Sequence, residues 1–282
     1  MSENNALKKN KTLIIVGMHR SGTSLVTQWL NKCGLAVGEE LLGPGIGNID
    51  GHYEDKDFFH LHEKILAVNN LPTDGLIGSG YIHIPTTLFE EMTQLIQKKN
   101  TLHMEWGWKD PRTCLFLNYY NELIPNAYYL FLIRDYQEVV GSLIKRGFAV
   151  KEQAWLERHT GWFKRLKWRQ YKRAKAWKQH IRETASRYLN THILYNQKIL
   201  DHIKKLPKER FFVANYRSLI KNHQLTLNTL VNEWGFHLEK KSFTSVFKSS
   251  LLSERIDFEG HVSSEDIKKA RRLEQMIRQS IH

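Results

Sequence analysis

The chain contains 282 residues and carries a formal net charge of +13, because 42 Lys and Arg outnumber 29 Asp and Glu. This length is sufficient for a full hydrophobic core, and the charge favours anionic partners. The sequence contains no run of about 18 apolar residues, which a membrane-spanning helix would need. The polar N-terminus lacks the apolar segment of a secretory signal. Two cysteines, Cys33 and Cys114, cannot form a metal cage and are expected to be buried thiols. We therefore expect a cytoplasmic protein without a metal.

Residues 11–31, KTLIIVGMHRSGTSLVTQWLN, contain a strand, a loop and the start of a helix. The apolar, mostly β-branched residues 13–16 are typical of a strand buried on both faces. Gly17 and Gly22 bound a G-x-x-x-x-G loop, which is the glycine spacing of a phosphate-binding loop. Apolar residues then recur with helical spacing from Thr23 onward. The N–H groups of the loop and the positive end of the helix dipole predict an anion site here.

The loop departs from the pattern of nucleoside triphosphatases. Those proteins have Lys directly after the second glycine, whereas Gly22 is followed here by Thr23 and Ser24. The cation of the loop is Arg20, which would lie beside the first phosphate of a ligand. The alternative is a tight strand-to-helix turn in which Thr23 only caps the helix.

Strands and helices alternate along the remaining chain. Strands are predicted at residues 102–108, 127–133 and 211–214. Helices are predicted at residues 58–66, 88–97, 113–123 and 137–146, the first of them capped by Asp55 or Asp57, with more helix after residue 216. This order predicts an α/β fold with a P-loop-like parallel sheet flanked by helices. We expect a polar tail at residues 1–11 and a single domain at residues 12–282.

Ligands of parallel sheets gather at the carboxyl ends of the strands. Gly17, Lys109, Arg134 and Tyr216 all follow predicted strands, so they should face one crevice. Arg134 and Ser142, in IRDYQEVVGS, are spaced so that a strand end and the following helix can hold one phosphate together. With Arg20, this pair predicts two separate anion sites for a ligand that has phosphates at both ends.

These motifs resemble the sulfotransferases that use 3′-phosphoadenosine 5′-phosphosulfate (PAPS). The 5′-phosphosulfate loop of that family, basic-Ser-Gly-Thr-Thr/Ser, is similar to Arg20-Ser21-Gly22-Thr23-Ser24. The 3′-phosphate site of the family resembles the Arg134 and Ser142 pair. A Tyr-Glu-Asp-Leu element near the adenine is similar to residues 216–219, Tyr-Arg-Ser-Leu, in which both acids are lost. GHYE at residues 51–54 and WKDPRTCL at residues 108–115 resemble bacterial and carbohydrate-directed members.

The resemblance implies transfer of a sulfuryl group from PAPS to a hydroxyl group, with a carbohydrate or glycolipid as acceptor and no metal. Arg20 would stabilise the leaving phosphate, and Lys109 would stabilise leaving-group or sulfuryl charge. Family members use a His or a Glu as the general base. No His is present near Lys109, so Glu54 is the first candidate and Asp110 the second. His19 is expected to support the loop.

Each of these acidic and basic residues also has a purely structural interpretation. Glu54 could be an acidic side chain that only stabilises the N-terminus of a helix by interacting with the helix dipole. Lys109, Asp110 and Arg112 could form a structural ion-pair turn.

A basic stretch at residues 151–182 has eleven Lys and Arg but only two acids. Its apolar residues recur with near-helical spacing: Trp155, Trp162, Phe163, Leu166, Ala174, Trp177 and Ile181. We expect a helical insertion at about residues 148–187. It could be a lid whose apolar face packs on the domain, a peripheral contact with an anionic membrane at its inner face, or a site for a nucleic acid or another polyanion.

The sequence also leaves two alternative functions open. A P-loop nucleotide or small-molecule kinase is disfavoured because no Lys follows Gly22 and no clear Mg²⁺-binding Asp follows an apolar strand. A non-catalytic basic module that binds membrane or nucleic acid would retain only a nucleotide-binding fold.

Overall fold

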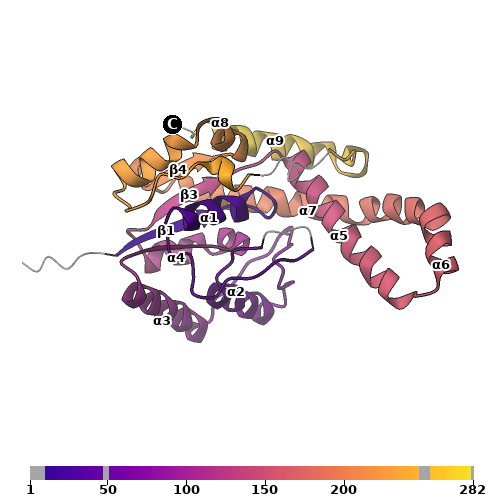
Figure 1. Cartoon of the computed structure of the whole chain (residues 1–282), viewed down its shortest axis with the longest axis horizontal. Helices are drawn as coiled ribbons and strands as arrows, with labels where there is room; N and C mark the ends of the chain where they lie inside the picture. The colour runs from indigo at the N-terminus through magenta and orange to yellow at the C-terminus, as the bar shows by residue number, and fades with distance from the viewer. Residues whose placement is uncertain (1–9, 47–50, 248–254, 281–282) are drawn as a thin grey trace, which may run out of the picture.

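The computed structural model describes residues 10–46, 51–247 and 255–280 (Figure 1). The predicted N-terminal tail therefore lies almost wholly outside the described residues, and the first strand begins at Lys11.

The core of the structure is a four-stranded sheet in which all strands are parallel, in the order β2-β1-β3-β4. The strands are β1 (Lys11–Val16), β2 (Glu105–Lys109), β3 (Tyr128–Leu132) and β4 (Phe211–Ala214). Sequence patterning predicts each of these strands, and the α/β fold class is confirmed. Because β1 lies between β2 and β3, the loop after β1 lies beside the carboxyl ends of both neighbours.

Helices cover both faces of the sheet. They are α1 (Thr23–Lys32), α2 (Lys56–Val68), α3 (Thr86–Leu102), α4 (Leu117–Leu123), α5 (Tyr136–Arg158), α6 (Trp162–Lys167), α7 (Arg173–Ile203), α8 (Tyr216–Asn228) and α9 (Ser264–Arg278). Successive residues of a strand point to opposite faces. Ile14 and Val16 thus pack in one buried cluster with α2–α5, α7 and α9, while Leu13 and Ile15 pack in a second with α1 and α8.

Three helix predictions need correction at their ends. The helix predicted at residues 88–97 extends over Thr86–Leu102, so the strand after it begins at Glu105 and not at residue 102. The helix predicted at residues 113–123 is preceded and partly replaced by a 3₁₀ helix, Pro111–Leu115, at whose start the Asp110 side chain accepts from the Arg112 N–H. The helix predicted at residues 137–146 continues to Arg158, because it pairs with α7.

Helices α5 and α7 run side by side away from the sheet and form a hairpin, with α6 at its far end (Figure 1). The last buried residue of α5 is Phe148, and the first buried residue of α7 is His180. The base of the hairpin therefore belongs to the core, whereas residues 149–179 are exposed or only partly buried. A π-helical turn, Trp168–Lys172, joins α6 to α7.

No helix in the described part of the chain is both long enough and apolar enough to cross a bilayer. Cys33 and Cys114 are buried free thiols, as predicted.

Gly107 allows close contact between the strands that carry Lys109 and the anion-binding loop. A Cβ atom at this position would lie 2.3 Å from the carbonyl oxygen of Leu13 on β1. We predict that Gly107→Ala lowers the free energy of unfolding by about 1–3 kcal/mol, because the strands must shift apart. Gly260→Ala is the matched control, since a Cβ there has no neighbour within 4 Å. Urea unfolding of both variants tests this, and equal midpoints would contradict it.

Candidate active site

The loop between β1 and α1 is built by backbone conformations that favour glycine. Gly22 and Arg20 have left-handed φ angles of 93° and 67°. A Cβ atom at Gly17 would lie 2.7 Å from both the Leu132 carbonyl oxygen and Ser21 Oγ. Gly22 is also the N-cap of α1 and has no side chain to cap the helix. The first N–H groups of α1 therefore lack an intrahelical partner and form the start of an anion site.

The hydroxyl groups of the loop have different contacts. Ser21 Oγ donates a hydrogen bond of 2.6 Å to the Met18 carbonyl oxygen, so its side chain holds the shape of the loop. Thr23 is buried at the start of α1. Ser24 Oγ accepts a hydrogen bond of 3.1 Å from Lys109 Nζ. Among these hydroxyls, Ser24 is thus the one that connects the loop to β2.

The two predicted anion sites are joined in the structure. Arg20 Nε donates to Ser142 Oγ at 2.9 Å, and Arg134 Nη1 donates to the Arg20 carbonyl oxygen at 2.9 Å. The neighbouring positions of β1 and β3 in the sheet bring Arg20 beside the Arg134–Ser142 pair. That the two groups hold different phosphates of one ligand stays a prediction.

Positive charge is concentrated around this cluster. Burial, together with the charges of Arg146 and Arg134, lowers the pKa of Arg20 to about 10. Glu138, which sequence reasoning missed, forms an ion pair of 2.7 Å with Arg134 and a second pair with Arg217. The available signal was its position in the first turn of the predicted helix, four residues after Arg134. An anion bound here would relieve the mutual repulsion of the arginines.

Lys109 lies fully buried at the end of β2. Its Nζ donates to Ser24 Oγ, to Glu54 Oε1 at 2.5 Å and to the carbonyl oxygen of His52. Burial lowers the pKa of Lys109. Burial likewise raises the pKa of Glu54, although the charge of Lys109 opposes that rise. The pair places a carboxylate with raised basicity next to the anion-binding loop.

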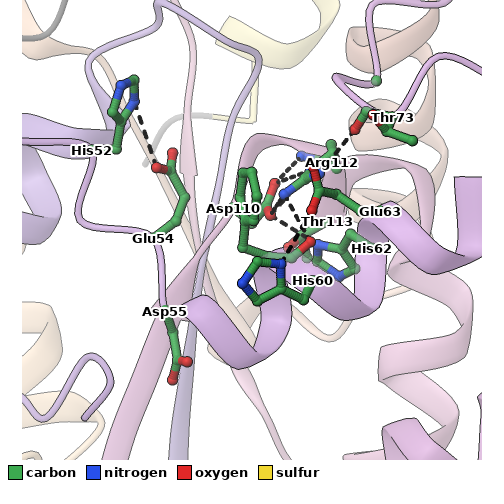
Figure 2. Close-up of polar contacts among 12 residues, drawn as sticks. His52, Glu54, Asp55, His60, His62, Glu63, Thr73, Asp110, Arg112 and Thr113 are labelled. Atoms are coloured by element: carbon green, nitrogen blue, oxygen red, sulfur yellow. Dashed lines mark hydrogen bonds and ion pairs between the residues drawn. The ribbon is translucent and has the colours of Figure 1, made fainter. Parts of the chain in front are cut away.

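Sequence reasoning missed His52 as a site residue, and the GHYE tetrapeptide at residues 51–54 was the available signal. His52 Nδ1 lies 3.6 Å from Glu54 Oε2 (Figure 2). Burial and the nearby charges of Arg146, Lys109 and Arg20 lower the pKa of His52 to about 4. Its imidazole is therefore neutral at pH 7.

Asp110 lies in a different environment, although it follows Lys109 directly. Its carboxylate is buried and contacts Arg112 Nη2 at 2.6 Å and His62 Nδ1 at 3.1 Å (Figure 2). Despite the burial, these groups hold the pKa of Asp110 well below its usual range. Arg112 in turn donates to the carbonyl oxygens of Thr73 and Phe59. This geometry matches the structural ion-pair turn that the sequence left open.

A cavity of about 760 Å³ adjoins these groups. Its wall is formed by the end of β1 and β2, by α2, and by the base of the α5–α7 hairpin, and includes His19, His52, Glu54, Asp110, Arg112, Leu143, Arg146, His180, Arg187 and Tyr188. Arg146 makes no ion pair with any other residue in the described ranges. Burial lowers the pKa of His19 to about 3, against the opposing charge of Asp110. His19 thus lines the cavity as a neutral side chain.

Tyr216 begins α8, directly after Asn215 caps that helix at the end of β4. The side chain of Tyr216 lies outside what the structure describes, so its predicted contact with the adenine stays a prediction. Across residues 10–46, 51–247 and 255–280, no group of three or more His, Cys, Asp or Glu side chains is arranged to hold a metal ion.

Several solved structures of sulfotransferases are similar to this chain. Sulfotransferase STF1 from Mycobacterium tuberculosis H37Rv has a similar fold, with a TM-score of 0.52 and 12% identity over 93% of this chain and 76% of its own. A sulfotransferase domain from the curacin biosynthetic pathway is also similar, with a TM-score of 0.46 and 14% identity over 94% and 98% of the two chains. The sulfotransferase domain of the Synechococcus PCC 7002 olefin synthase gives a TM-score of 0.43, at 14% identity over 94% and 95%.

No curated protein matches the chain significantly. The model of the sulfotransferase family matches residues 12–240, which is most of the chain. The chain therefore belongs to the sulfotransferase family.

Proposed function

We propose that this protein transfers a sulfuryl group from PAPS to a hydroxyl group of a carbohydrate or glycolipid. One observation carries the proposal: a loop that can bind an anion, crowded by arginines, adjoins a cavity whose wall includes Glu54, the ion-pair partner of the buried Lys109. The first part suits a polyanionic donor, and the second suits removal of a proton from an acceptor.

The residues present fit PAPS as the donor. Arg20 and the first N–H groups of α1 would hold its 5′-phosphosulfate, and Arg134 and Ser142 would hold its 3′-phosphate. When bound, PAPS supplies the activated sulfuryl group. The absence of Lys after Gly22 argues against a triphosphate, because no long cation follows the loop to reach the distal phosphates.

Glu54 is proposed as the general base. It lines the cavity, and its raised pKa makes it a stronger base than an exposed carboxylate. Glu54 takes the proton of the acceptor hydroxyl while Lys109 and the loop N–H groups stabilise the negative charge that collects on the departing phosphate. Asp110 is the weaker candidate because Arg112 and His62 enclose its carboxylate and lower its pKa. We assign Asp110 to positioning Arg112.

The cavity supports a sugar-containing acceptor. A volume of about 760 Å³ is suitable for a ligand the size of a small oligosaccharide. Its wall combines groups that form hydrogen bonds, such as Glu63, Asp74 and Arg146, with apolar side chains such as Leu76 and Leu143. A sugar presents hydroxyl groups at its edges and C–H groups on its faces, so it can use both kinds of surface.

Donor binding can be tested without turnover. We predict that 3′,5′-bisphosphoadenosine at a hundred-fold excess over its Kd stabilises the fold by about 2.7 kcal/mol without Mg²⁺. At equal concentrations, AMP should stabilise less because it lacks the 3′-phosphate. Arg134→Ala should remove this difference, whereas the exposed Arg272→Ala should keep it. Thermal-shift assays measure these effects. Equal stabilisation by AMP would show that the 3′ site is misassigned, and stabilisation by Mg-ATP alone would indicate a kinase.

If Glu54 is the base and Asp110 is structural, substitution of the two carboxylates should have different effects on activity. Glu54→Gln should reduce kcat by at least about 100-fold, because the amide keeps the shape but cannot accept the proton. Stabilisation by 3′,5′-bisphosphoadenosine should persist. Asp110→Asn should lower the free energy of unfolding by about 3–5 kcal/mol, because Arg112 then remains buried without its counter-ion. Glu54→Gln should also destabilise the fold, because it removes the counter-ion of the buried Lys109, so the two variants are distinguished by kcat measured on folded protein. Near-full activity of Glu54→Gln, together with an inactive but stable Asp110→Asn, would reverse the assignment.

The pH dependence of kcat/KM gives an independent test of the base. Glu54 acts only when deprotonated, so activity should rise with pH through its pKa, which lies above the ordinary value of 4.5. If His52 were the base, the acidic limb would instead fall at about pH 4. The profile is measured between pH 3.5 and 8 for the wild type and His52→Gln. An acidic limb of the kcat/KM profile with its midpoint above pH 4.5, unchanged in His52→Gln, would support Glu54 as the base.

A further inference from the structure

The end of the α5–α7 hairpin presents large apolar side chains to solvent. We define the hairpin tip as residues 159–172, which include α6. Within it, the exposed fractions are 64% for Trp162, 69% for Phe163, 41% for Leu166 and 73% for Tyr171. Helix α6, which carries Trp162, Phe163 and Leu166, lies at the end of the hairpin that is farthest from the sheet (Figure 1). No other described part of the chain covers them.

This exposure is selective, because other aromatic residues of the same hairpin are packed. The Trp155 ring stacks on Trp168 with centroids 4.4 Å apart and on His159 at 4.2 Å. Trp168 Nε1 also donates to Glu152 Oε1 at 3.0 Å. These contacts hold the end of the hairpin together without Trp162 or Phe163. Packing of the hairpin therefore does not account for the exposed pair.

The hairpin tip is also strongly basic. It contains five Lys and Arg and no acid: Lys164, Arg165, Lys167, Arg169 and Lys172. All five side chains are exposed. Nearby Glu152 is engaged by Arg173, at 2.7 Å, and by Trp168. The positive charge of the tip is thus not neutralised by ion pairs within the described residues.

The lid interpretation holds only for the base of the hairpin. Ile181 is buried and Trp177 packs against the core, while Arg146 and Tyr188 line the cavity. The buried part of α5 ends at Phe148, so about ten further residues, or about 15 Å of helix, separate the core from the end of α5. The tip therefore does not cover the site.

We propose that the hairpin tip binds the surface of an anionic lipid bilayer. Trp and Phe are favoured at the boundary between headgroups and acyl chains, and surrounding Lys and Arg are attracted to anionic lipid. A polyanion such as RNA would use the cations and stack its bases on aromatic rings, but it offers no apolar layer for Leu166. The proposal goes beyond sulfuryl transfer and does not depend on it. If the cavity also holds the acceptor as proposed above, the acceptor would be linked to a lipid.

Vesicle co-sedimentation of the full chain tests this proposal. Vesicles of phosphatidylcholine with about one-third phosphatidylglycerol are compared with phosphatidylcholine alone, at 0.1 M and 0.5 M NaCl. Binding should require the anionic lipid and weaken at high salt, because added salt shortens the range of the attraction. Trp162→Ala with Phe163→Ala should weaken binding about ten-fold or more, because less apolar surface enters the bilayer. The control is Tyr81→Ala, which removes a side chain that is 85% exposed elsewhere.

The contribution of charge is tested by a second pair of variants. Three cations near an anionic surface contribute about 1 kcal/mol each, so replacing them should weaken binding about a hundred-fold. The tip variant is Lys164→Gln, Lys167→Gln and Arg169→Gln, and its charge-matched control is Lys204→Gln, Lys208→Gln and Lys240→Gln. The control should bind nearly as tightly as the wild type. Both tip variants should keep the stabilisation by 3′,5′-bisphosphoadenosine, because their altered side chains are exposed and distant from the loop.

Three results would overturn the proposal. The first is no binding to anionic vesicles, or equal binding by both tip variants and their controls. The second is salt-sensitive binding to RNA or heparin, without vesicle binding, which would make the tip a polyanion site. The third is a dimer in sedimentation experiments that Trp162→Ala with Phe163→Ala dissociates, which would make the tip a contact between copies of this chain.

Discussion

The buried ammonium group of Lys109 connects the parts of the candidate site. Its three hydrogen bonds reach Ser24 on α1, the backbone of His52, and the carboxylate of Glu54. A buried charge is costly unless it is paired and its hydrogen bonds are satisfied, so these contacts stabilise one another. Because Lys109 is the last residue of β2, the sheet fixes the distance between the anion-binding loop and the proposed base.

The two acidic residues of the site, Glu54 and Asp110, have different surroundings. Glu54 pairs with Lys109, which also contacts the anion-binding loop through Ser24. Burial raises the pKa of Glu54. Asp110 is enclosed by Arg112 and His62, which lower its pKa. The chain thus separates a carboxylate suited to accept a proton from one that holds the cavity wall in place. A similar division applies to Ser21, which shapes the loop, and Ser24, which contacts Lys109.

The hairpin combines two environments in one pair of helices. Its base contributes to the hydrophobic core and to the cavity, whereas its tip carries exposed aromatic and basic side chains. Gly147 allows the two helices to approach closely at the base, since a Cβ atom there would lie 2.7 Å from the Tyr188 hydroxyl. A rigid base with a separate tip would allow surface binding and catalysis to use the same element without sharing residues.

The amino-acid sequence by itself determined the four strands, the glycine loop and the order of the helices, because these depend on local periodicity and on glycine spacing. The position of Arg20 in the glycine loop, and of Lys109 and Arg134 at strand ends, also follows from sequence. The sulfotransferase family could likewise be recognised from the loop and the Arg134–Ser142 pair.

Only the tertiary structure decided which of these residues touch. Arg20 meets Ser142 because β1 and β3 are neighbours, and Glu54 meets Lys109 because the loop before α2 crosses the end of β2. The same holds for the hairpin. Near-helical spacing placed Trp155, Trp162 and Trp177 in one apolar set, but their burial differs because each depends on where the partner helix lies. Helical periodicity reports a local preference, whereas contacts and burial arise from residues that are distant in the chain.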